Sequence, residues 1–254
     1  MSIQIYTEWL ILVFLVSLRL GALFVLAPVL GSIRAPGSFR VFLVVALAAV
    51  LVASLGVEKI AVPSSVFGLL SAALSEVMVG GLLAFGLFAA FSAFMVGGRA
   101  IDMQIGFGVA NLIDPISRTQ APLLGTAMNL MGIAVFLAVD GHHLLLRGFA
   151  VSLERVTPGS GLFEVSVPAL AAQFGVAFSL GLAMAAPVLV LLLLIDLGLS
   201  IMSRTMPQWN VFFVSMPLKI FAGLVILALS IPHMGTVMSA LFKSIFAFWD
   251  RVLP

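Results

Sequence analysis

Six long apolar segments constrain this chain more than any other feature. They cover residues 9–30, 41–57, 66–96, 123–139, 170–200 and 211–231. Backbone groups in lipid must be hydrogen-bonded within the protein, so apolar runs of this length predict helices. The chain is 63% hydrophobic and only 9% charged, whereas a soluble domain is about half apolar and a quarter charged. We therefore predict an all-α, polytopic integral membrane protein of about six helices, with residues 1–254 forming a single membrane-associated domain.

Charge and cysteine content exclude several classes of function. The net charge is only +2, with 12 basic against 10 acidic residues, so no basic surface for nucleic acid is predicted. The absence of cysteine excludes disulfides, thiolate metal sites and cysteine nucleophiles. The first apolar segment follows Glu8 and not a basic residue, which favours a retained helix over a cleaved signal peptide.

The distribution of basic residues does not orient the chain in a membrane. If all six segments cross, five basic residues fall on each side, so the positive-inside rule predicts neither orientation. One explanation is that the segments are not all ordinary lipid-facing spans.

A polar stretch over residues 98–122 separates the third and fourth apolar segments. Gly106 and Gly108 are favourable places for a bend, and Pro115 disfavours a helical conformation at Asp114. The stretch is predicted to be a broken connection. On composition alone, an ordinary loop between two spans is an equally good interpretation.

Four ionisable residues fall inside apolar segments: Arg19, Glu76, Asp196 and Lys219. Such residues are costly in a membrane and face protein or water, so they could form a proton or ion relay or pair structurally between packed helices. No two of them have a spacing that defines a site, which favours structural pairing. A secondary transporter or ion channel that uses Glu76, Asp196 and Lys219 remains the alternative.

No P-loop, GxGxxG or GxSxG motif is present, and we predict no enzyme activity, no catalytic residue and no cofactor.

Asp140, Gly141, His142 and His143 form a short run that suggests a metal site. Adjacent histidines rarely point the same way on a helix, and no carboxylate lies at the HExxH spacing. The sequence therefore favours a helix end with its break at Gly141 over a metal site.

Two further patterns concern packing. Glycines at positions 80, 81, 86, 175 and 181 predict close helix contacts. Residues 234–254 have apolar side chains at helical spacing, including Val237, Leu241, Ile245 and Phe248, which predicts an amphipathic C-terminal helix on a membrane or a partner.

The chain resembles the FliR family of flagellar biosynthetic proteins and its injectisome counterpart, the T subunit of type III secretion export gates. The resemblance lies in the order and spacing of a set of residues. The resemblance runs along essentially the whole chain. The residues that carry it are Pro28, Gly31, Pro36, Arg40, Asp102, Gln104, Gly106, Phe107, Asp114, Pro115, Gly141, His142, His143, Pro207, Asn210, Val211, Phe212, Pro217, Lys219 and Gly223.

The resemblance implies a subunit of a helical gate, with its helices bent into hairpins, in the bacterial inner membrane at the flagellar basal body. The implied partners are FliP-like and FliQ-like gate subunits, FlhB-like and FlhA-like export components, unfolded export substrates and membrane lipid. It also implies that the central stretch plugs the closed channel. The plug residues would be Gly106, Phe107, Gly108, Val109, Asn111, Leu112, Ile113, Asp114, Pro115 and Ile116.

Overall fold

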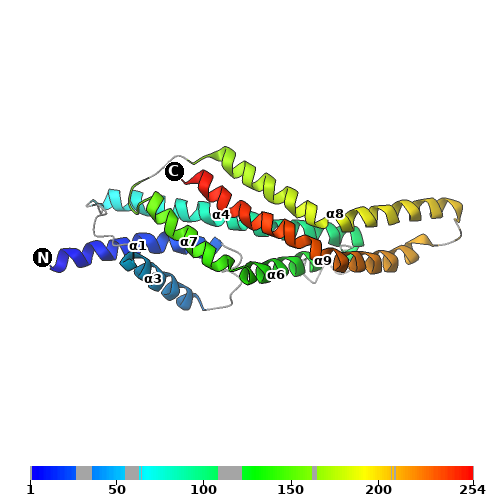
Figure 1. The fold of residues 1–254 in the computed structure, drawn as a ribbon, viewed down its shortest axis with the longest axis horizontal. Helices are drawn as coiled ribbons and strands as arrows, with labels where there is room; N and C mark the ends of the chain where they lie inside the picture. The colour runs from blue at the N-terminus through cyan, green and yellow to red at the C-terminus, as the bar shows by residue number, and fades with distance from the viewer. Residues whose placement is uncertain are drawn as a thin grey trace. The chain divides into compact units, whose positions relative to one another are not determined.

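Every regular element of the described chain is an α-helix (Figure 1). The computed structural model describes residues 2–26, 36–54, 63, 65–107, 122–161, 165–206, 208 and 210–253, and no strand occurs within these ranges. The helices are α1 (Ser2–Leu26), α3 (Gly37–Ser54), α4 (Val66–Ile105), α6 (Leu123–Ala138), α7 (Gly141–Arg155), α8 (Val167–Thr205) and α9 (Val211–Val252).

The predicted all-α membrane architecture is confirmed. By length and composition, five of the described helices, α1, α3, α4, α8 and α9, could each cross a membrane. The pair α6 and α7 meets the same test only when the two helices are taken together as one broken span, which gives up to six.

Helix α4 is longer than the sequence predicted. It continues from the third apolar segment through the first eight residues of the polar stretch and ends at Ile105. Gly106 follows with a φ of 99°, a left-handed conformation that glycine adopts without steric cost. The first eight residues of the polar stretch are therefore helical, and the chain leaves the helix at Gly106, one of the two glycines at which a bend is predicted.

Two further predictions need correction. Helix α7 was not predicted, because it is short, carries charged residues, and buries only one face, with Leu145 and Phe149 directed inward.

The predicted C-terminal amphipathic helix is not a separate element but the last part of α9, which runs on through Pro232. Its apolar face, including Leu241 and Phe248, is buried within this chain. That face is therefore not a surface for lipid or a partner.

The chain divides into two compact units. The first contains Met1–Phe88, Asp140–Gln173 and Ser244–Pro254. In its core, the indole Nε1–H of Trp249 donates a hydrogen bond to the carbonyl oxygen of Leu83 at 3.0 Å, and the same ring lies against Gly86 and Gly148. A side chain at either glycine would collide with aromatic rings, so these two positions let the end of α9 pack closely on α4 and α7.

The second unit contains Ala89–Val139 and Phe174–Lys243. Its core is an aromatic cluster from α4, α6 and α9, with ring centroids 5.2–6.1 Å apart: Phe91, Phe94, Phe136 and Phe242. Beside the cluster, α4 and α8 approach closely at Gly97 and Gly181, where a Cβ on Gly97 would lie 2.5 Å from the carbonyl oxygen of Gly181. Small residues let membrane helices reach this separation.

The glycine predictions are confirmed at some positions and wrong at others. Gly80, Gly86 and Gly181 meet neighbouring helices, whereas a Cβ at Gly81 or Gly175 would have no atom of the described chain within 4 Å. Gly80, Gly86 and Gly181 lie on helix faces that pack against a neighbouring helix, whereas Gly81 and Gly175 do not. The spacing of the glycines alone does not show which face of a helix is packed.

Gly80→Ala should destabilise the protein, whereas Gly81→Ala should not. A Cβ at position 80 would collide with the carbonyl oxygen of Arg19 and lie 2.9 Å from the Cβ of Ala22. Overpacking of this kind costs about 1–3 kcal/mol. At position 81 alanine meets no atom and gains up to ~1 kcal/mol of helix propensity. The measurement is the fraction of full-length chain that stays soluble in detergent after heating, and equal losses for both variants would contradict the packing.

Candidate functional site

The most deeply buried charges form an ion pair in the first unit. Arg19 Nε donates to Glu76 Oε2 at 2.6 Å, and the two side chains are 0% and 1% exposed. The guanidinium also donates to the carbonyl oxygens of Ser152 at 2.8 Å and Val156 at 2.9 Å, and Glu76 Oε1 accepts the N–H of Gly159 at 3.2 Å. Val156 follows the last residue of α7, and its N–H already donates to the carbonyl oxygen of Ser152 at 3.0 Å. Arg19 therefore adds a side-chain donor to both carbonyls at this helix end. The cluster joins α1 and α4 to the C-terminal end of α7.

The second pair lies in the second unit and is less buried. Lys219 of α9 pairs with Asp196 of α8, and the side chains are 21% and 34% exposed. Gln104 Nε2, near the end of α4, donates to the other carboxylate oxygen of Asp196 at 2.9 Å. The structure thus brings together Arg19 with Glu76 and Asp196 with Lys219, and it assigns the two pairs to different units.

Asp102 fixes the start of α6 to the last turns of α4. Its carboxylate, on a residue that is 5% exposed, accepts the backbone N–H of Leu124 at 3.0 Å and that of Gly125 at 3.1 Å. The first N–H groups of a helix have no intrahelical acceptor, and a carboxylate there is also favoured by the helix dipole. The backbones meet nearby, since a Cβ on Gly98 would lie 2.6 Å from the nitrogen of Gly125.

These contacts hold both ends of the segment predicted to be the plug. Of the plug residues, the structure describes Gly106, with its positive φ, and Phe107, which is half-buried. Eight predicted plug residues lie outside the described residues: Gly108, Val109, Asn111, Leu112, Ile113, Asp114, Pro115 and Ile116.

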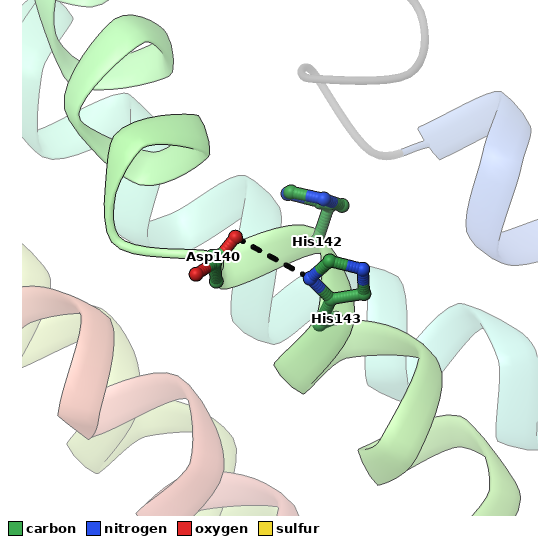
Figure 2. Close-up of side chains that lie close together, drawn as sticks. All are labelled: Asp140, His142 and His143. Carbon is green, nitrogen blue, oxygen red and sulfur yellow. Dashed lines mark ion pairs between the residues drawn. The ribbon is translucent and has the colours of Figure 1, made fainter.

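Asp140, His142 and His143 lie together at the first turn of α7 (Figure 2). The two imidazole ring centroids are 4.1 Å apart, so the expectation that these adjacent histidines point apart is wrong. The predicted break at Gly141 is also displaced by one residue: Gly141 is the first residue of α7, and Asp140 takes the left-handed conformation, with φ 56°. Aspartate is among the few side chains that tolerate this conformation.

Sequence analysis did not find the contacts of Asp102, Gln104 and Ser152. Asp102 and Gln104 are visible in the sequence as polar residues, but each finds its partner on a helix that is distant in the chain. The available signal for Asp102 is its position one turn before the bend at Gly106, and the Leu124 N–H that it accepts lies 22 residues further along the chain.

Comparison with known proteins identifies the family. The family model described as "Bacterial export proteins, family 1" matches residues 10–245. The chain belongs to this family. It is 33% identical to the flagellar biosynthetic protein FliR of Bacillus subtilis over 90% of this chain and 89% of that protein. It is 30% identical to FliR of Aquifex aeolicus over 96% and 94% of the two chains. It is also similar to the surface presentation of antigens protein SpaR of Shigella flexneri, with 30% identity over 79% of this chain and 77% of that protein.

The matched range, residues 10–245, covers the positions of both ion pairs and of the Asp102 contact. The resemblance inferred from the sequence to the FliR family is confirmed.

Proposed function

We propose that this chain is a subunit of the type III protein export gate in the bacterial inner membrane, at the flagellar basal body. With FliP-like and FliQ-like subunits it would form the channel through which unfolded flagellar proteins cross, and FlhB-like and FlhA-like components would work with that gate. The observation that carries the proposal is the family match over residues 10–245, together with FliR relatives that align over about nine-tenths of both chains.

The surface of the described chain supports a protein that works among other helices. Helix α3 buries only a narrow stripe, formed by Val44, Ala48 and Val52, and exposes large apolar residues around the rest of its circumference. Helices α8 and α9 also expose leucine, valine and phenylalanine along much of their length. Exposed apolar area on this scale requires lipid or partner helices to cover it.

The proposed plug is the segment between α4 and α6. An idle export channel must remain closed to ions, because the membrane potential supplies about 2.3 kcal/mol per charge per 100 mV for leakage. A plug must fill the pore and still leave when a substrate arrives. In the sequence, glycines flank Phe107 at positions 106 and 108, and glycine has the widest choice of backbone conformations. The residues that follow would supply the apolar bulk of the plug: Val109, Leu112, Ile113 and Ile116.

The described residues on both sides of this segment are held by contacts between helices, and we call them the base of the proposed plug. Asp102 ties the start of α6 to α4, and Gln104 ties the end of α4 to Asp196 on α8. Ile105 packs against Gly223 of α9, where a Cβ would lie 2.6 Å from its side chain. The mechanism we propose is occlusion, in which the base stays in place while the proposed plug, residues 106–116, moves.

The transporter alternative gains no support from the ion pairs. Glu76 accepts hydrogen bonds on both oxygens, from Arg19 and Gly159. Asp196 is engaged by Lys219 and Gln104. Carboxylates that are held in this way are better explained as structural groups than as ion ligands, and we propose that all four charges stabilise the fold.

Purification of the tagged full-length chain from its host membrane tests the proposal. We expect FliP-like and FliQ-like membrane proteins to copurify in mild detergent, and an equally tagged, unrelated membrane protein of the same host serves as the control. Mass spectrometry identifies the copurified proteins. A monodisperse, stable monomer that binds a small solute would favour a transporter instead.

A further inference from the structure

We propose that Asp140, His142 and His143 bind a divalent transition-metal ion, with Zn²⁺ as the best match. One ligand atom from each side chain can be chosen so that all three lie within 4.8 Å of one another (Figure 2). Neutral imidazole nitrogens and a carboxylate oxygen are ligands that Zn²⁺ accepts. The inference does not depend on the proposed export function.

The backbone at the start of α7 builds this cluster. Asp140 is the single non-glycine residue of the described chain with a positive φ, and such conformations persist where surrounding structure enforces them, often at functional sites. The turn directs its carboxylate back over the helix, so that Oδ1 lies 3.4 Å from His143 Nδ1. The N–H of His143 also donates to the carbonyl oxygen of Asp140 at 3.0 Å. The carboxylate and the second imidazole are therefore held side by side.

A second, independent observation is that one ring nitrogen of His142 has no hydrogen-bond partner. Its Nδ1 is buried but has no hydrogen-bond partner among the described residues, a property shared there only with Gln173 Oε1. Buried polar atoms of native proteins nearly always have a partner, and an unpaired one calls for an explanation. A metal ion bound in the plane of the His142 ring at Nδ1 would supply that partner.

The three ligand atoms need to move only a short distance toward one another to hold the ion. Zinc–nitrogen bonds of about 2.0–2.1 Å place tetrahedral ligand atoms roughly 3.4 Å apart, so the farthest of the present atoms must approach by roughly 1.4 Å. Asp140 and His143 are 74% and 70% exposed, so both side chains can turn without disturbing the core. The carboxylate also offsets the partial positive charge, about half an elementary charge, that a helix has at its N-terminus. Water can occupy the fourth position.

Equilibrium dialysis of the full-length chain in detergent against Zn²⁺ tests the site. We expect one Zn²⁺ per chain at micromolar free metal. His143→Ala and Asp140→Asn should each weaken binding at least about tenfold, since loss of even a group that only supports a ligand costs 10–100-fold. His233→Ala is the matched control, because His233 is the third and last histidine of the chain and lies exposed on α9. It should leave Zn²⁺ binding unchanged.

A second measurement needs no variant and covers the case in which a substitution prevents folding. Co²⁺ bound by imidazole nitrogens in a tetrahedral site gives visible absorption bands, and these bands should appear with the unaltered chain and disappear when Zn²⁺ is added. Absence of both Zn²⁺ uptake and Co²⁺ bands at micromolar metal would overturn the proposal. So would Zn²⁺ binding of equal strength by the parent chain, His143→Ala and Asp140→Asn.

Discussion

Replacing Arg19 with methionine should remove most of the full-length chain from the membrane. Arg19 is fully buried, pairs with Glu76 at 2.6 Å and donates to the carbonyl oxygens of Ser152 and Val156 at the C-terminal end of α7. Its loss leaves the Glu76 carboxylate buried without a counter-charge, at a cost of about 3–5 kcal/mol. Proteins are stable by only about 5–15 kcal/mol, so the loss consumes a large share of the total. The measurement is the steady-state amount of chain in the membrane.

Three variants separate this effect from a general loss of charge. Arg155→Met breaks the exposed pair with Asp250, whose side chain is 68% exposed, and should cost at most about 1 kcal/mol. Arg19→Lys should also fail, because an ammonium cannot replace the planar guanidinium that reaches acceptors on two helices. The double replacement Arg19→Met with Glu76→Met should recover much of the lost chain, because no unpaired charge remains. If the double variant were no better than Arg19→Met, the account of the pair would be wrong.

Most of the fold could be predicted from the sequence because lipid imposes simple requirements on a chain. Long apolar runs must be helices, and α1, α3, α4, α8 and α9 each contain one. Helix α7 escaped prediction because its sequence lacks such a run, and only its packing in the first unit gives it an apolar side. The continuation of α9 through Pro232 also escaped, because proline in a membrane helix is tolerated where neighbouring groups compensate.

The site was predictable only in part. The sequence marks Arg19, Glu76, Asp196 and Lys219 as unusual, but it does not show which residues meet, because partners such as Glu76 and Gly159 are 83 residues apart. The sequence disfavours a metal site at Asp140 because adjacent histidines usually diverge on a helix and because no carboxylate lies at the HExxH spacing. In the structure the rings of His142 and His143 lie 4.1 Å apart, and the left-handed turn at Asp140 places its carboxylate beside His143.

Removal of residues 109–116 should leave the assembled complex permeable to ions and small solutes. The deletion takes away the apolar bulk of the proposed plug but keeps Asp102 and its contacts to the start of α6, so assembly should survive. Replacing the same residues by glycine and serine at equal length should also cause leakage. That result would show that the loss of apolar side chains opens the pore, and not the shortening of the segment. Phe107→Ala and Ile113→Ala should leak less. The measurement is the sensitivity of cells that express the whole gate to a normally excluded solute. Gly81→Ala, where an added Cβ meets no atom of the described chain within 4 Å, is the control expected to behave as the parent.

The most direct test of the central claim is the ionic conductance of the purified complex in a planar bilayer. The account predicts that the complex with the parent chain is closed at rest, and that the complex lacking residues 109–116 conducts ions steadily. Both samples must first show the same copurified subunits in the same proportions. A deletion complex of unchanged composition that remained closed would contradict the plug proposal and make residues 106–122 an ordinary connection between α4 and α6.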